Sequence, residues 1–363
     1  MVKVPKIKLL NFRKIILVTW PFLLALLVFV VVRLSIRNSA LVELAYSEHI
    51  YPIIAVFFSF LSHLIPFSLW DIFWVLILIA LIGTLVLVIF KKVKFRWYVL
   101  RSFQLLALLY SFFYISWGYN YFRPNIEKRL KWETPPTDEK LFRSVLDTLI
   151  AETNKNYTSF TSADYPELDK LVEESYLRNA HELDILYPNG TRRPKTMIFS
   201  SFFAKVGVSG YFGPFFNEIQ LNRYNLPMDY PFVLAHEKAH QFGFTSESEA
   251  NLVAFIICTK SEDQRVRYSG FQSLLLYFLK DASRMLDYKI FISKIDTVVI
   301  KDFHMRQKYY QALENKNLSR VQTKANDIYL KANKVDKGVK NYNQVVSLVT
   351  GWYYNTVMKK GKN

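Results

Sequence analysis

The sequence predicts a multi-pass membrane protein with three α-helical spans, followed by an α+β domain that is rich in helix. Two observations support this prediction. The chain of 363 residues is 51% hydrophobic and 17% aromatic, which is high for one soluble domain. Long apolar runs fill the chain up to residue 123, whereas charged residues and prolines follow it. We therefore predict a membrane domain over residues 1–123 and a second domain over residues 124–363.

Three apolar runs are long enough to cross a bilayer as helices. They are predicted over about 15–34, 72–90 and 102–122, because a helix that rises about 1.5 Å per residue needs about 20 residues to span the apolar core. The first run is longer than a signal-peptide core and lacks a small-residue cleavage site, so we interpret it as an uncleaved anchor. A fourth run, over about 51–68, has prolines that bracket a short apolar stretch, and we predict an interfacial helix there.

The basic residues predict the orientation of these spans. Five of them precede the first span and five more lie between the second and third spans. Because basic residues stay in the cytoplasm, the N-terminus is predicted to be cytoplasmic and the domain over 124–363 extracytoplasmic, at the cell membrane. A membrane span over 51–68 would reverse the side of everything that follows it.

Charge and cysteine content limit the partners and the kinds of site. Lysine and arginine outnumber acidic residues 47 to 30, and the formal charge of +17 favours contact with anionic membrane lipid, anionic envelope polymer or nucleic acid. A solvated basic surface is the alternative. We find no nucleic-acid-binding motif and expect no nucleic-acid partner. The single cysteine, Cys258, lies in an apolar run, which predicts a buried thiol and excludes a disulfide framework or a thiolate metal site. The sequence leaves the oligomeric state open.

The domain over 124–363 alternates helical patterns with two short strand-like segments. Thr137 is a plausible N-cap for a first helix, and a second helix begins near residue 164. Strands are expected within 194–201 and 217–222, separated by the glycine-rich segment 206–216. Further helical patterns follow residue 261. These elements give the α+β, helix-rich character of the domain.

The segment "LAHEKAHQFGF" contains the candidate metal-binding and catalytic residues. A helix from about 229 to 242 places His236 and His240 on one face, one turn apart, where two imidazoles can hold one tetrahedral zinc ion. Glu237 lies around the helix from His236, in the position of a general base that reaches a water on the metal. A pair of structural histidines is the alternative. The motif predicts a zinc site with Glu237 as the catalytic residue.

A third zinc ligand is expected shortly after this helix. Gly243 can end the helix in a left-handed conformation, and a new helix can begin at Ser246. We favour Glu247 as the ligand, with Glu249 as the rival, although Glu249 also fits a capping box with Ser246. Asn251, four residues after Glu247, is expected to hydrogen-bond a ligand imidazole.

The chain resembles a family of bacterial membrane proteins catalogued as a domain of unknown function with a zincin-type signature. The resemblance rests on "YPIIAVFFSFLSHLIPFSLWD", "GYFGPFFNEIQLN", "LPMDYPFVLAHEKAHQFGFTSESEANLVAF" and "NDIYLKANKVDKGVKNYNQVVSLV". It implies an integral membrane protein with one extracytoplasmic zincin-like domain, and it implies no substrate. The glutamate and the supporting residue four positions later resemble thermolysin-like zincins, whereas Ser246 stands where metzincins have their third histidine. By analogy with zincins, "NEIQLN" would be the edge strand that pairs with a peptide.

These observations together predict a membrane-anchored, zinc-dependent hydrolase, a metallopeptidase acting on a peptide or protein substrate at the outer face of the cytoplasmic membrane. Tyr211 and Tyr329 are candidates for the group that stabilises the oxyanion. The alternative is a non-catalytic scaffold or binding protein that uses the metal for stability. A transporter fits less well, because the spans contain hardly any charged residues.

Overall fold

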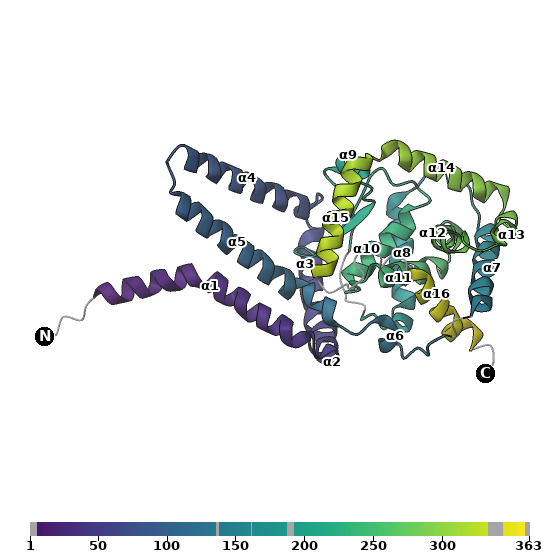
Figure 1. The fold of residues 1–363 in the computed structure, drawn as a ribbon, viewed down its shortest axis with the longest axis horizontal. Coiled ribbons are helices and arrows are strands. Elements are labelled where there is room, and N and C mark those ends of the chain that lie inside the picture. Colours follow the sequence, from purple (N-terminus) through teal and green to yellow (C-terminus); the bar gives the residue numbers. More distant parts are fainter. Residues whose placement is uncertain (1–5, 136–137, 161, 187–191, 333–343, 360–363) are drawn as a thin grey trace. The chain divides into compact units, whose positions relative to one another are not determined.

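A computed structural model of the chain describes residues 6–135, 138–160, 162–186, 192–332 and 344–359 (Figure 1). The chain divides into two compact units. Unit 1 consists of residues 1–54 and 69–123, and unit 2 consists of residues 55–68 and 124–363. A short piece of the N-terminal region therefore belongs to the same unit as the C-terminal part of the chain.

Unit 1 is built from helices. Its elements are α1 (Lys6–Ser35), α2 (Ser39–Leu41), the π-helix η1 (Val42–Ile50), the start of α3 (Tyr51–His63), α4 (Leu69–Ile89), α5 (Phe95–Ser116) and the 3₁₀-helix η2 (Gly118–Phe122). Helix α1 packs along α5, where the Gln104 side-chain amide donates to the carbonyl oxygen of Val18 at 2.8 Å. The large apolar side chains of α4 are exposed, as expected for helices whose solvent is lipid.

The described residues contain four helical stretches that are long and apolar enough to cross a membrane, one more than the three predicted. They are Ile16–Ser35, Ser39–His63, Leu69–Ile89 and Phe95–Ser116. The additional stretch exists because α2, η1 and α3 join without a break. The Tyr51 amide bonds to the carbonyl of Tyr46, five residues back, and this wider turn lets the helix continue past Pro52. The predicted span over 102–122 begins earlier and ends at Ser116, where the chain tightens into η2.

The C-terminal part of α3 and the segment that follows it pack within unit 2 through two serines. The Ser62 hydroxyl donates to Oε1 of Glu218 at 2.7 Å, and the Gln220 side-chain amide donates to the Ser68 hydroxyl at 3.2 Å. Both serines are buried. The opposite side of this segment exposes large apolar side chains: Ile53, Phe57, Phe60, Leu61, Leu64 and Phe67. The segment is therefore two-faced, polar toward the sheet of unit 2 and apolar toward its surroundings.

The remainder of unit 2 is rich in helix and carries one small sheet. Its helices are α6 (Ile126–Arg129), α7 (Glu139–Lys155), α8 (Tyr165–Asn179), η3 (His181–Leu183), α9 (Ser200–Lys205), α10 (Tyr230–Gln241), α11 (Glu247–Thr259), α12 (Gln264–Ala282), α13 (Tyr288–Ser293), α14 (Thr297–Leu313), α15 (Lys316–Ala332), α16 (Val345–Tyr353) and η5 (Tyr354–Met358). Its strands are β1 (Lys195–Thr196), β2 (Gly210–Gly213) and β3 (Glu218–Leu221).

The sheet corrects one prediction. Its order is β1-β3-β2, with β1 parallel and β2 antiparallel to β3. The segment 217–222 thus forms the central strand, and the expectation that it would be the edge strand was wrong. The two edge strands are β1 and β2. Strand β2 lies inside the glycine-rich segment, because extended glycines can pair with β3 although the segment lacks the side-chain alternation of a strand.

Two smaller predictions concern α7 and Cys258. Thr137, the predicted N-cap, lies outside the described residues; α7 begins at Glu139, and the Asp138 carboxylate caps it by accepting from the Lys140 amide at 2.9 Å. Cys258 is fully buried in α11, which confirms the predicted buried thiol.

Helix α10 occupies the centre of unit 2. It contacts β2 and β3 on one side and α8, α11 and α12 on the others. Its apolar residues Leu234, Ala235 and Ala239 are fully buried in the main hydrophobic core. Because α10 is enclosed on several sides, its polar side chains are held in fixed positions relative to α11.

Candidate metal centre

Helix α10 ends in a turn that positions one of its own histidines. The Phe244 amide donates to the carbonyl of Ala239 at 3.1 Å, and the Gly243 amide donates to the carbonyl of His240 at 3.0 Å. This pair of bonds is a Schellman motif, which requires the left-handed φ of +85° that Gly243 adopts. The same turn directs the Phe244 carbonyl oxygen to Nδ1 of His240, 2.6 Å away.

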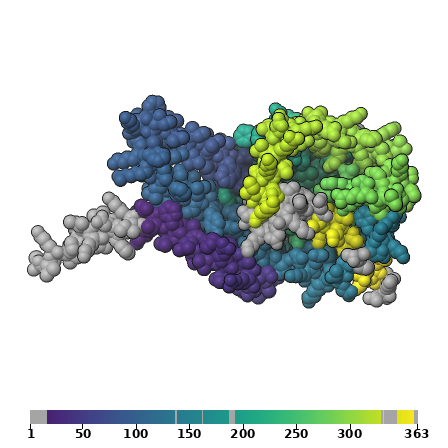
Figure 2. Space-filling view, in the orientation of Figure 1, coloured from purple at the N-terminus to yellow at the C-terminus, as the bar shows by residue number. Residues whose placement is uncertain are grey.

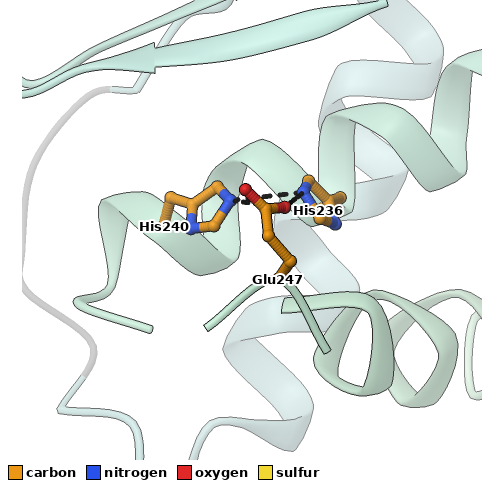
Figure 3. Close-up of side chains that lie close together, drawn as sticks. All are labelled: His236, His240 and Glu247. Atoms are coloured by element: carbon orange, nitrogen blue, oxygen red, sulfur yellow. Dashed lines mark hydrogen bonds and ion pairs between the residues drawn. The ribbon is translucent and has the colours of Figure 1, made fainter. Parts of the chain in front are cut away.

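Helix α11 begins directly after this turn and brings a carboxylate to the two imidazoles. Nε2 of His236 and Nε2 of His240 lie 3.2 Å apart. Oε2 of Glu247 lies 3.2 Å from the first nitrogen and 3.6 Å from the second (Figure 3). A tetrahedral zinc site with bonds of about 2.0 to 2.1 Å has ligand atoms about 3.3 Å apart. The three atoms therefore fit three corners of such a site.

Hydrogen bonds on the far side of each ring set its tautomer. The Phe244 carbonyl can only accept, so Nδ1 of His240 carries the hydrogen. Nδ1 of His236 faces Oδ1 of Asn251 at 2.9 Å and donates in the same way. In neutral rings both Nε2 atoms are then lone-pair donors, and they face each other and the Glu247 carboxylate. In this state the three acceptor atoms favour a shared cation, either a proton or a metal ion.

A proton competes with a metal for this position. Burial lowers the pKa of His240, but the hydrogen bond to Glu247 and the charges of Glu247 and Glu237 outweigh burial and raise it to about 9. Burial raises the pKa of Glu247, but its hydrogen bonds to both histidines outweigh burial and hold that pKa well below its usual value. A metal must displace the imidazole proton, so its affinity is expected to increase with pH.

Glu237 lies beside the three ligand candidates and is 5% exposed. Burial raises the pKa of its carboxyl group, while the two histidines oppose this effect. Strand β2 passes directly over it, because a Cβ atom built on Gly210 would lie 2.7 Å from Oε1 of Glu237. Glycine is required at this position for the edge strand to approach the carboxylate.

Glu249, the rival ligand, points away from the cluster. Its Oε1 accepts from the backbone amide of Ile126 at 2.9 Å. Helix α11 does begin after Ser246 as predicted, but the predicted capping box is wrong in one respect. The Ser246 hydroxyl makes no cap bond to α11 and lies 2.9 Å from the Ser248 hydroxyl. Of the two glutamates, the structure brings only Glu247 to the histidines.

Two tyrosines were candidates for stabilising the oxyanion, and the structure describes the side chain of only one of them. The Tyr211 ring packs against Phe203, with ring centroids 5.2 Å apart. The side chain of Tyr329 lies outside the described side chains. A third tyrosine, Tyr277 of α12, lies close enough to the site for Glu247 to act on it: burial raises its pKa, Arg306 lowers it, and Glu247 raises it further.

The sequence could not have identified Tyr277 or Gly210 as neighbours of the site. Both come from elements distant in the sequence, and neither belongs to a motif that specifies a metal centre. The glycine-rich composition around Gly210 was visible, but its reason, the close approach to Glu237, depends on how β2 pairs with β3.

Comparison with known proteins gives one match. No curated protein and no solved structure is significantly similar to this chain. A family model described as a protein of unknown function, DUF3810, matches residues 46–350, which include most of unit 2 and the whole candidate metal centre. The chain therefore belongs to the DUF3810 family of proteins of unknown function.

Proposed function

We propose that this protein is a membrane-anchored, zinc-dependent peptidase. The observation that carries the proposal is the convergence of Nε2 of His236, Nε2 of His240 and Oε2 of Glu247 at distances of 3.2 to 3.6 Å. Imidazole nitrogen and carboxylate oxygen are ligands that zinc prefers, and three protein ligands leave a fourth position open, as in catalytic zinc sites. The motif resembles that of zincins.

Zinc held by these residues would act as a Lewis acid on the scissile carbonyl and would lower the pKa of a water nucleophile to about 7. Glu237 accepts the proton of the attacking water and returns it to the leaving amine. Its buried position suits this role, because burial raises its pKa toward the pH at which a general base must exchange protons. Asn251 and the Phe244 carbonyl keep the imidazoles oriented.

The edge strand β2 supports a peptide as substrate. The Asn222 amide donates to the carbonyl of Ser209, and in an antiparallel ladder the next residue, Gly210, then directs its backbone groups away from β3. An extended peptide added at this edge would lie over Glu237. A cavity of about 300 Å³ begins one residue earlier, at Ser209, and its other walls include Asn225, Arg306 and Tyr310. This cavity provides room for side chains of such a peptide.

We further propose that unit 2 lies outside the cytoplasm. Basic residues gather at the N-terminal end of the chain, up to Lys14 within α1, and around the connection from α4 to α5, from Lys91 to Arg101. If α1, α4 and α5 cross the membrane and α3 does not, both basic segments lie in the cytoplasm and the chain after α5 lies outside it. Two buried serines, Ser62 in α3 and Ser68 after it, support this arrangement, because their hydroxyls bond to the sheet of unit 2.

The experiment that tests the activity compares the full-length protein with Glu237→Gln. The purified wild type is expected to contain stoichiometric zinc and to cleave members of a peptide library, and removal of zinc by a chelator is expected to abolish cleavage reversibly. Glu237→Gln keeps the size of the side chain but removes the base, so turnover should fall by about 10²- to 10⁴-fold while zinc content stays unchanged. An equally active variant would refute the mechanism. Stoichiometric zinc without any cleavage would favour the scaffold instead.

A further inference from the structure

Helix α15 presents a row of apolar side chains to its surroundings. Leu318, Val321 and Ile328 are spaced three and seven residues apart, so they lie on one face of the helix. Their exposed fractions are 40%, 66% and 69%. A helix on the surface of a soluble domain normally turns such a face inward. The apolar face of α15 therefore requires a partner.

A second face of α15 is basic. Lys316, Arg320 and Lys324 are exposed, and none of them takes part in an ion pair with another described residue. The only acidic residue of the helix, Asp327, pairs with Lys331. The remaining face carries Ser319, Gln322 and Thr323, which line the cavity of unit 2. Helix α15 thus turns its uncharged polar face toward the cavity and leaves its apolar and basic faces outward.

Helix α9 extends the apolar face. The Asn315 amide, at the start of α15, donates to the carbonyl of Lys205, the last residue of α9, at 2.8 Å. We define the α9–α15 surface by six exposed apolar residues: Phe202 of α9, Ile198 and Phe199 just before this helix, and Leu318, Val321 and Ile328 of α15. Figure 2 shows α15 at the outside of unit 2.

The position of this surface within unit 2 indicates what covers it. Figure 1 draws α3, α9 and α15 at one edge of unit 2 and α13 at the opposite edge. Helix α3 continues without a break from the apolar stretch that starts at Ser39, and its own outward side chains are apolar. Within unit 2, residues 55–68, which join the chain to the apolar stretches on either side of them, therefore lie at the edge that carries α15.

We propose that the α9–α15 surface docks on the surface of an anionic phospholipid bilayer. Apolar side chains bordered by lysine and arginine are the pattern of helices that lie in the membrane interface, where the apolar face enters the acyl boundary and the basic residues meet anionic headgroups. A second copy of the chain is a poorer occupant, because basic residues border the surface and each chain carries a formal charge of +17. This docking is independent of the proposed zinc chemistry.

The test places a fluorescent probe on the full-length protein in nanodiscs that contain phosphatidylglycerol. Single cysteines are introduced as Val321→Cys and, as a control, Leu286→Cys, an even more exposed apolar position between α12 and α13. Cys258 is buried and needs no replacement. A polarity-sensitive label at 321 is expected to shift to the blue and to be quenched by lipids that carry a spin label near the headgroup, whereas a label at 286 is not.

A charge variant sharpens the test. Neutralising Lys316, Arg320 and Lys324 to glutamine should lower the docking equilibrium about 100-fold, because each basic residue near an anionic surface contributes roughly 5-fold. The same change at Lys280, Arg284 and Lys289, near α13, should leave quenching unchanged. Equal quenching at 321 and 286 would overturn the proposal. A blue shift at 321 without quenching would also overturn it, because protein and not lipid would then cover the surface.

Discussion

The two ends of α10 carry buried polar clusters that differ in one respect. At its N-terminal end, the Asp229 carboxylate accepts two hydrogen bonds from Nε of Arg306, each at 2.9 Å. It also accepts from the Tyr310 hydroxyl at 2.8 Å and from the Gln272 amide at 3.0 Å. Every one of these contacts joins a donor to an acceptor, and one positive charge meets one negative charge. The Asp229 carboxylate is therefore compensated by donors and by one positive charge.

When both imidazoles are neutral, the cluster near the C-terminal end of α10 brings three acceptor atoms together without a hydrogen between them. Each neutral imidazole has one N–H, which donates to the Asn251 side-chain oxygen in His236 and to the Phe244 carbonyl in His240. The Nε2 atoms that face Glu247 then carry no hydrogen. Buried polar groups are normally paired, and an uncompensated set is costly. Burial and polarity are shared by the two clusters; the excess of acceptors distinguishes the second one and favours a cation there.

The largest expected effect comes from removing the Glu247 carboxylate, the third acceptor of the cluster. Glu247→Ala leaves two histidines, and we expect the protein to lose its zinc during dialysis, a greater loss than the roughly 10- to 100-fold that accompanies loss of a supporting hydrogen bond. Metal content after dialysis, measured on the full-length protein in detergent, is the readout. Retention of stoichiometric zinc by this variant would show that Glu247 is no ligand.

Glu249→Ala is the matched control for that variant. It removes a carboxylate from the same helical turn, but the lost partner is the Ile126 amide and not the histidine pair. Zinc should therefore remain bound. Stability should fall by about 1.5 to 3 kcal/mol, the range for a hydrogen bond to a charged group. If this variant loses the metal and Glu247→Ala keeps it, the ligand assignment is reversed.

The next variant tests the Asp229 cluster at the N-terminal end of α10. Asp229→Asn removes the charge that faces Arg306 and points an amide donor at groups that also donate. Breaking a buried ion pair costs about 3 to 5 kcal/mol, and the low end applies because the Arg306 side chain is partly exposed. A loss of about 3 kcal/mol should lower the unfolding midpoint by roughly 6 to 12 °C. Zinc should stay bound; zinc loss without loss of stability would contradict the division into two separate clusters.

The contrast also shows what the sequence could reveal. The spacing of His236 and His240 depends only on helical geometry, and the turn at Gly243 followed by a helix at Ser246 brings Glu247 back by local geometry as well. These relations were predictable because they span few residues. Metal binding by this cluster stays a prediction.

Relations between distant segments were not predictable. The approach of Gly210 to Glu237 and the central position of β3 depend on strand pairing, which no short pattern fixes. The continuation of the helix past Pro52 depends on a π-turn, and the proline alone suggested a break there. The choice of Glu247 over Glu249 was favoured by spacing, but the partner that occupies Glu249, the amide of Ile126, comes from a segment more than a hundred residues earlier.

The smallest expected effect concerns Asn251, which is not a ligand candidate but accepts a hydrogen bond from one of the two histidines. Asn251 accepts from Nδ1 of His236 and thereby keeps the lone pair of Nε2 directed at the site. Asn251→Ala frees the ring to rotate or to change tautomer, so zinc affinity should fall by roughly 10- to 100-fold, while the three ligands remain. Competition with a chelator of known affinity measures this change. Asn251→Asp keeps an acceptor at the same place and should bind zinc at least as tightly as the wild type. If alanine and aspartate at this position bind zinc equally well, the hydrogen bond to Asn251 does not orient His236, and the excess of acceptors at the C-terminal end of α10 has to be explained without it.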